Sequence, residues 1–153
     1  MNMTSTDRIE KRVLLRAPRA KVWRALADAR AFGEWFGVDL AGSFAPGARL
    51  RGRITHKDYE HLQMEIAVED VEPERRISWR WHPNDVDGAD LGAEPTTLVV
   101  FELDDTGSGT MLTLTESGFD ALPPARRAGA YRGNEQGWTQ QMQAIERYVG
   151  QAA

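Results

Sequence analysis

Glu116 is the side chain in this sequence that is best placed to do chemistry. It follows Leu112 and Leu114 at two-residue spacing in a segment with strand-like alternation, so the three side chains should share one face. An unpaired carboxylate on an apolar face is costly to ionise, which suits a general acid or base, or a donor to a ligand carbonyl. The alternative is a strand-end glutamate that reaches water or pairs with an arginine. Glu116 is thus a weak catalytic candidate.

A row of basic side chains lies on another expected strand, where Arg49, Arg51 and Arg53 alternate with other residues. One of them could pair with Glu116 or hold an anionic ligand. The other interpretation is a solvated strand face, because exposed charges commonly stabilise nothing specific. The sequence leaves both open.

Other catalytic and metal-binding patterns are missing from the sequence. The three histidines (His56, His61 and His82) have no HxH, HxxxH or HExxH spacing, and there is no cysteine. Ser108 lies between two glycines in an expected turn, without the flanking residues of a nucleophile elbow. We therefore predict no metal and no cofactor, and we expect His82 to be exposed at a strand end.

The composition excludes several classes of protein. The chain has 153 residues, 41% of them hydrophobic and 27% charged, which is typical of one globular domain. A net charge of -4 argues against nucleic-acid binding. No apolar run approaches the roughly 18 residues that span a bilayer, and the N-terminus lacks the apolar stretch of a secretory signal. We expect a cytoplasmic protein with no nucleic-acid or membrane partner.

The hydrophobic pattern predicts the elements that would position Glu116. A strand over residues 9–16 is followed by two short helices, over 18–28 and 31–36. Five further strands are expected over residues 48–55, 62–69, 77–82, 97–103 and 110–117, with a polar loop over 83–95 and a turn over 104–109. Six strands, five of them consecutive, indicate an antiparallel sheet.

The C-terminal segment has the pattern of a long amphipathic helix. Its apolar stripe consists of Tyr131, Asn134, Trp138, Met142, Ile145 and Val149. Glycines at 129, 133 and 137 lower helix propensity, so we expect a bend or interruption in the first half. The helix over about 134–149 should bury its stripe on the sheet.

The order of these elements resembles the helix-grip fold of the Bet v 1 and START-like superfamily (SRPBCC). Residues 17–26 (APRAKVWRAL) and 34–36 (EWF) are similar to the opening signature of that superfamily. Residues 94–103 (EPTTLVVFEL) and 113–119 (TLTESGF) are similar to the last two strands of the activator of heat-shock-protein-90 ATPase-like family. Residues 137–138 (GW) complete the pattern.

The resemblance implies an α+β fold in which a curved, six-stranded antiparallel sheet wraps around a long C-terminal helix. The domain would cover residues 8–150, leaving 1–7 and 151–153 as flexible termini. Ligands of such proteins occupy a cavity between sheet and helix. The alternation suggests that it is lined by Trp35, Phe36, Met64, Ile66, Trp79, Trp81, Leu112, Leu114, Glu116, Trp138 and Met142. The competing interpretation is that these residues only fill the core.

Three functions remain open at this stage. The first is a binding protein for a small hydrophobic or aromatic molecule, without chemistry of its own. The second is a cyclase, aromatase or hydrolase that uses an inward acid such as Glu116. The third, suggested by the family resemblance, is a chaperone-associated interaction domain. Exposed edge strands also make a homodimer possible.

Overall fold

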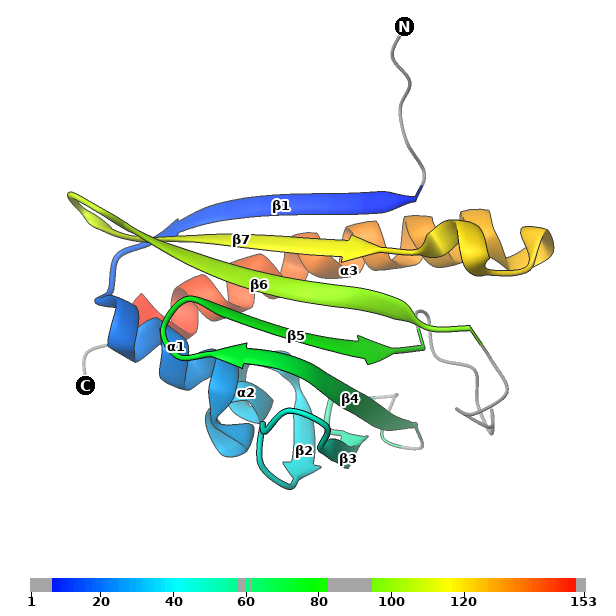
Figure 1. The fold of residues 1–153 in the computed structure, drawn as a ribbon, viewed down its shortest axis with the longest axis horizontal. Helices are drawn as coiled ribbons and strands as arrows, with labels where there is room; N and C mark the ends of the chain where they lie inside the picture. Colours follow the sequence, from blue (N-terminus) through cyan, green and yellow to red (C-terminus); the bar gives the residue numbers. More distant parts are fainter. Residues whose placement is uncertain (1–6, 58–59, 61, 83–94, 151–153) are drawn as a thin grey trace, which may run out of the picture.

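A computed structural model gives the fold and describes residues 7–57, 60, 62–82 and 95–150. The helical elements are α1 (Arg19–Ala27), α2 (Ala29–Phe36), the short 3-10 helix η1 (Phe119–Ala121) and α3 (Pro124–Gly150). The strands are β1 (Arg8–Leu15), β2 (Val38–Ala41), β3 (Arg49–Ile54), β4 (Gln63–Glu72), β5 (Arg76–Trp81), β6 (Thr97–Thr106) and β7 (Gly109–Ser117). The order of these elements, with a sheet packed on a long C-terminal helix, agrees with the expected α+β helix-grip fold (Figure 1).

The strands form one antiparallel sheet in the order β1-β7-β6-β5-β4-β3-β2. The expectation of six strands missed β2, an edge strand. It has only four residues, and only Val38 and Leu40 of these are buried, too short an alternation to recognise. The turn between β6 and β7 is tighter than expected, because Thr106 already pairs with Gly109.

Two glycines set the path from α2 into β2. Gly37 ends α2 with a φ of 93°, a left-handed conformation that favours glycine. Gly33 lies against β2 so closely that a Cβ there would be 2.1 Å from the carbonyl oxygen of Val38. The missing side chain at Gly33 therefore lets α2 pack directly on the edge strand.

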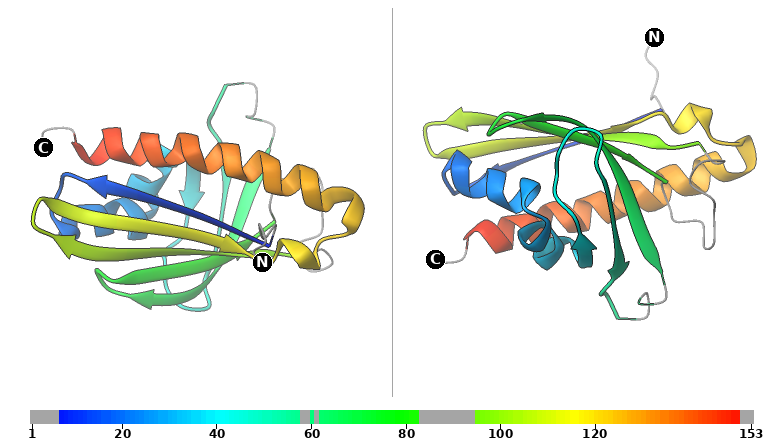
Figure 2. Two further views of the ribbon diagram at one scale, coloured as in Figure 1. Left: turned by 90° about the horizontal axis from the view of Figure 1, so that it is seen from above. Right: turned by 60° about the horizontal axis from the view of Figure 1, so that its bottom comes forward.

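The long helix α3 lies along one face of the curved sheet, while α1 and α2 cover one end of that face (Figure 2). Trp138, Met142, Ile145 and Val149 are buried, which confirms that this stripe grips the sheet. The expectations of a start near residue 134 and of an interruption at the glycines were wrong, because one helix runs from Pro124 to Gly150.

Tertiary contacts explain why the first half of α3 stays helical. Ala130 is buried, and the ring of Tyr131 packs at 5.3 Å on the ring of Phe119. The Tyr131 hydroxyl also donates a hydrogen bond to the carbonyl oxygen of Arg8 on β1. These contacts outweigh the low propensity of the three glycines.

Some expectations concern the ends of the described segments. Asp7, assigned above to a flexible terminus, accepts hydrogen bonds from the backbone N–H groups of Gly118 and Asp120. Residues 1–6, 151–153 and most of the expected loop over 83–95 lie outside the described residues. None of the described helices has the length and hydropathy needed to cross a membrane.

Candidate functional site

Glu116 lies on the inner face of the sheet and has no exposed surface. It belongs to β7, where Thr110, Leu112, Leu114 and Glu116 are all buried and the residues between them are half-buried. The two neighbouring strands place Ile9 of β1 and Val99 of β6 opposite it. The period of two thus carries a carboxylate into the core, as the sequence predicted.

Four side chains donate hydrogen bonds to this carboxylate. The indole Nε1 of Trp138 lies 2.7 Å from Oε1, and the indole Nε1 of Trp81 lies 2.8 Å from Oε2. The Thr97 hydroxyl lies 2.5 Å from Oε2, and the Asn134 amide nitrogen lies 3.0 Å from both oxygens. The donors come from β5, β6 and α3, so one side chain of β7 connects three other elements.

These contacts decide between the environments considered for Glu116. The carboxylate does not reach water, and the ion pairs of the described residues include none to Glu116. Arg49, Arg51 and Arg53 are exposed, and the first two pair with Glu65. Pairing of this arginine row with Glu116 was therefore the wrong alternative, and neutral donors replace a cation.

An aromatic cluster surrounds the Glu116 site. The rings of Phe36, Trp81 and Trp138 form a triangle with centroid separations of 5.7 to 6.0 Å. Trp79 extends the cluster from Trp81, at 5.1 Å, and Phe101 packs at 5.9 Å from Trp138. Most of these pairs meet edge to face, the arrangement that aromatic quadrupoles favour.

The inward side chains are not equally enclosed. Phe36 keeps 7% of its surface exposed, Met64 and Met142 keep 6% each, and Trp81 is only half-buried. These four come from α2, β4, α3 and β5, and all four are large apolar or aromatic side chains. Phe36 and Trp81 are in ring contact, and Trp81 donates a hydrogen bond to Glu116. We call the four residues Phe36, Met64, Trp81 and Met142 the accessible apolar patch, because each keeps some exposed surface.

The eleven residues predicted to line a cavity all lie in the core or pack against it. Four of the eleven have no exposed surface: Ile66, Trp79, Leu112 and Leu114. The side chain of Trp35 is turned toward α1, where its indole N–H donates to the carbonyl oxygen of Ala25. The remaining predicted residues are Phe36, Met64, Trp81, Glu116, Trp138 and Met142.

Two polar residues of the site were missed at the sequence level. Thr97 begins β6 and is completely buried, and Asn134 is half-buried one helical turn before Trp138. Asn134 belonged to the predicted stripe of α3, so a polar residue within an apolar stripe was the available signal. His82 was expected to be exposed, and it is in fact buried.

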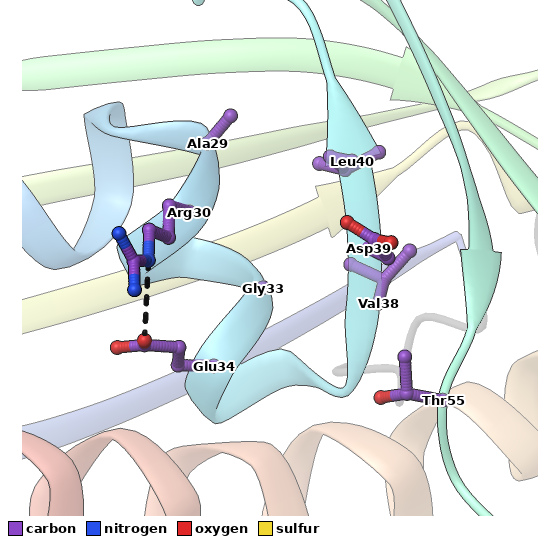
Figure 3. Close-up of a pocket in the computed structure, with 8 residues that line it drawn as sticks. All are labelled: Ala29, Arg30, Gly33, Glu34, Val38, Asp39, Leu40 and Thr55. Atoms are coloured by element: carbon purple, nitrogen blue, oxygen red, sulfur yellow. Dashed lines mark ion pairs between the residues drawn. The ribbon is translucent and has the colours of Figure 1, made fainter.

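A separate groove lies outside this core, between α2 and the edge strand β2 (Figure 3). It has a volume of about 530 Å³ and is lined by Ala29, Arg30, Gly33, Glu34, Val38, Asp39, Leu40 and Thr55. The Arg30 and Glu34 side chains pair with each other across 3.7 Å at its rim. Its lining mixes charges of both signs.

Tyr148 joins α3 to α2 near this groove. Its hydroxyl donates to Oε1 of Glu34 at 2.6 Å. This hydrogen bond, supported by partial burial and by the negative charge of Glu34, raises the pKa of Tyr148 to about 12. Among the described residues, no three His, Asp or Glu side chains gather in a way that could hold a metal ion.

An antiparallel sheet that grips a long C-terminal helix, with two short helices after the first strand, defines the helix-grip class of α+β proteins. Within that class, the model of the activator of Hsp90 ATPase homolog 1-like proteins matches residues 16–150. The chain belongs to this family. Among proteins with curated descriptions, none matches the chain.

Solved structures share the fold over nearly the whole chain. Protein MLL2253 from Mesorhizobium loti is 27% identical with a TM-score of 0.73, covering 93% of this chain and 96% of its own. DynU16, from the dynemicin biosynthetic locus, is also 27% identical with a TM-score of 0.72, and the match covers 94% of this chain but 47% of DynU16. The Aha1 dimer of Colwellia psychrerythraea is 16% identical with a TM-score of 0.70, covering 93% and 95%.

Proposed function

We propose that this protein binds a small hydrophobic molecule, flat or aliphatic, between the inner face of the sheet and α3. The observation that carries the proposal is the accessible apolar patch formed by Phe36, Met64, Trp81 and Met142. By comparison, Trp79 and Ile66 on the same inner face have no exposed surface.

The chemistry of the patch suits such a ligand. Two aromatic rings offer flat faces, and two methionines offer flexible, polarizable side chains that adapt to irregular shapes. One buried polar group, Glu116, lies beside the patch with its four donors. Pockets for small molecules commonly combine an apolar wall with a few fixed polar groups.

One of the relatives also supports a small-molecule site. DynU16 belongs to the dynemicin biosynthetic locus, and this chain matches about half of it at 27% identity. Proteins of a biosynthetic locus handle small organic molecules, which a protein with an apolar cavity could bind. The identity of that protein's ligand does not transfer to this chain.

The alternative function is an enzyme that uses Glu116 as a general acid or base. Its two oxygens accept five hydrogen bonds from four protein side chains, so a substrate would have to displace Trp81 or Asn134 to meet the carboxylate. A binding role needs no displacement, which is why we favour it. A homodimer and a chaperone partner stay predictions, the dimer being a property of the Colwellia protein.

The test is a titration of the folded protein with N-phenylnaphthylamine, an uncharged dye that fluoresces in apolar surroundings. We expect saturable binding of one dye per chain, together with quenching of tryptophan fluorescence. Met142→Phe should weaken binding by about tenfold or more, because the larger ring fills the accessible patch.

Met111→Phe is the matched control, since Met111 lies on β7 between the inward positions Thr110 and Leu112 and so faces the opposite side of the sheet. It should leave the dissociation constant within about twofold. Circular dichroism would establish that both variants are folded. A dye that binds without saturation, or equally to both variants, would contradict a site in this cavity.

A further inference from the structure

The negative charge of Glu116 has no cationic partner in the described part of the structure. All four of its hydrogen-bond partners (Trp81, Thr97, Asn134 and Trp138) are uncharged. Buried carboxylates are more commonly balanced by arginine or lysine. The site next to the accessible patch therefore holds a carboxylate with no positive charge bound to it.

Both oxygens of the Glu116 carboxylate are occupied by donors. Indole and amide N–H groups can only donate, and they reach both oxygens, from Trp138 and Asn134 to Oε1 and from Trp81 and Asn134 to Oε2. Hydrogen bonds from neutral donors stabilise an anion without cancelling its charge. A ligand in the neighbouring cavity would thus experience a net negative charge.

Several basic residues of the sheet are paired with other carboxylates; on the neighbouring strand β1, Arg8 pairs with Glu10. Lys11 lies on β1 opposite Leu114, and its ammonium group pairs with Glu135 of α3. Arg49 and Arg51 pair with Glu65 on the exposed face.

We propose that the cavity selects uncharged or cationic hydrophobic molecules and rejects anionic ones such as fatty-acid carboxylates. The inference rests on the proposed function, because it names the class of ligand for that same site. An anionic ligand would meet Glu116 through a medium of low dielectric constant, where like charges repel much more strongly than in water. A cationic head group would be attracted by the same charge.

Two dyes that share one skeleton test this selectivity at neutral pH. N-phenylnaphthylamine is uncharged, and anilinonaphthalene sulfonate adds one negative charge to the same ring system. We expect the sulfonate to bind at least about tenfold more weakly to the unmodified protein. In competition, dodecylamine should displace the uncharged dye at a concentration about tenfold lower than dodecanoate does.

The outcomes separate this inference from the proposed function. If neither dye binds, the proposed function fails and the selectivity with it. If both dyes bind with dissociation constants within about threefold, or if dodecanoate competes as well as dodecylamine, the cavity exists and the charge selectivity is wrong. These measurements use the unmodified chain, so they do not depend on any variant folding.

The variant Glu116→Gln tests whether Glu116 causes the difference in affinity between the two dyes. In the folded variant we expect the difference between the two dyes to fall below about threefold, because the charge is gone. Glu102→Gln changes the net charge of the protein by the same amount at an exposed position of β6 and should keep the full difference. A difference that persists in the Glu116 variant would overturn the assignment.

Discussion

The indole nitrogen of Trp138 lies 2.7 Å from Oε1 of Glu116, and this hydrogen bond joins the last helix to the last strand. The same carboxylate accepts a hydrogen bond from the indole of Trp81 on β5. One side chain of β7 therefore links α3 to β5, next to Trp81 of the accessible apolar patch.

Replacing this carboxylate should destabilise the protein. In Glu116→Gln, one oxygen becomes an amide N–H₂ group that faces donors, and at least one buried donor loses its acceptor. We expect the free energy of unfolding to fall by about 1–3 kcal/mol in urea denaturation. The exposed Glu102→Gln should change it by less than about 0.5 kcal/mol. Equal stability of the two variants would show that the four donors do not depend on Glu116.

The grip of α3 on the sheet can be measured at its buried stripe. Ile145 has no exposed surface, and its truncation to alanine should cost about 2–5 kcal/mol of unfolding free energy because a cavity is left in the core. Met142→Ala should fall in the same range or slightly below it. Gln143→Ala, at an exposed position of the same turn, should change stability by less than about 0.5 kcal/mol. Losses that small at both buried positions would mean that α3 does not hold the sheet.

Two glycines in helices should respond to alanine with opposite signs. At Gly33 a Cβ would lie 2.1 Å from the carbonyl oxygen of Val38, so Gly33→Ala must push α2 away from β2 and lower the melting temperature. At Gly137 nothing lies within 4 Å of the added Cβ, so Gly137→Ala should stabilise α3 by about 0.5–1 kcal/mol. Thermal unfolding followed by circular dichroism distinguishes the two, and a stabilised Gly33→Ala would contradict the close contact of α2 with β2.

How far the sequence predicts this structure depends on the range of each interaction. The alternation in β7 is local, and it was enough to place Glu116 inside the sheet. Its donors lie 18 to 35 positions away along the chain, so no spacing rule could identify Trp81, Thr97 or Asn134 as its partners. The environment of the carboxylate therefore required the tertiary structure.

The errors in the secondary structure have the same physical origin. Helix propensity suggested a break near the glycines of α3, but burial of Ala130 and packing of Tyr131 on Phe119 keep the helix continuous. The edge strand β2 offers only two inward residues as a signal, and its position depends on the close approach of Gly33. Contacts between elements, which local sequence patterns do not contain, determine both the continuity of α3 and the position of β2.

The hydrogen bond between Tyr148 and Glu34 makes stability depend on alkaline pH. The pKa of Tyr148 is raised in the folded state from 10.0 to about 12, because the neutral hydroxyl is the donor. Its contribution is therefore complete below pH 10.0 and is lost as the pH rises through about 12. The unmodified protein should lose unfolding free energy more steeply across this interval than Tyr148→Phe does.

Ultraviolet absorbance of tyrosinate gives a second readout of the same prediction. The variant should lack the transition that occurs latest, near pH 12. Parallel pH profiles of stability for the two proteins would show that the hydrogen bond between α3 and α2 does not form in solution.

The most direct test of the ligand site follows the indole N–H signals of the five tryptophans in a nitrogen-15 correlation spectrum. Adding N-phenylnaphthylamine should shift the indole signals of Trp81 and Trp138, whose N–H groups bind Glu116 beside the accessible patch. The signal of Trp23, half-buried on α1, should stay in place. Binding that leaves Trp81 and Trp138 unchanged, or that shifts only Trp23, would contradict a ligand cavity between the sheet and α3.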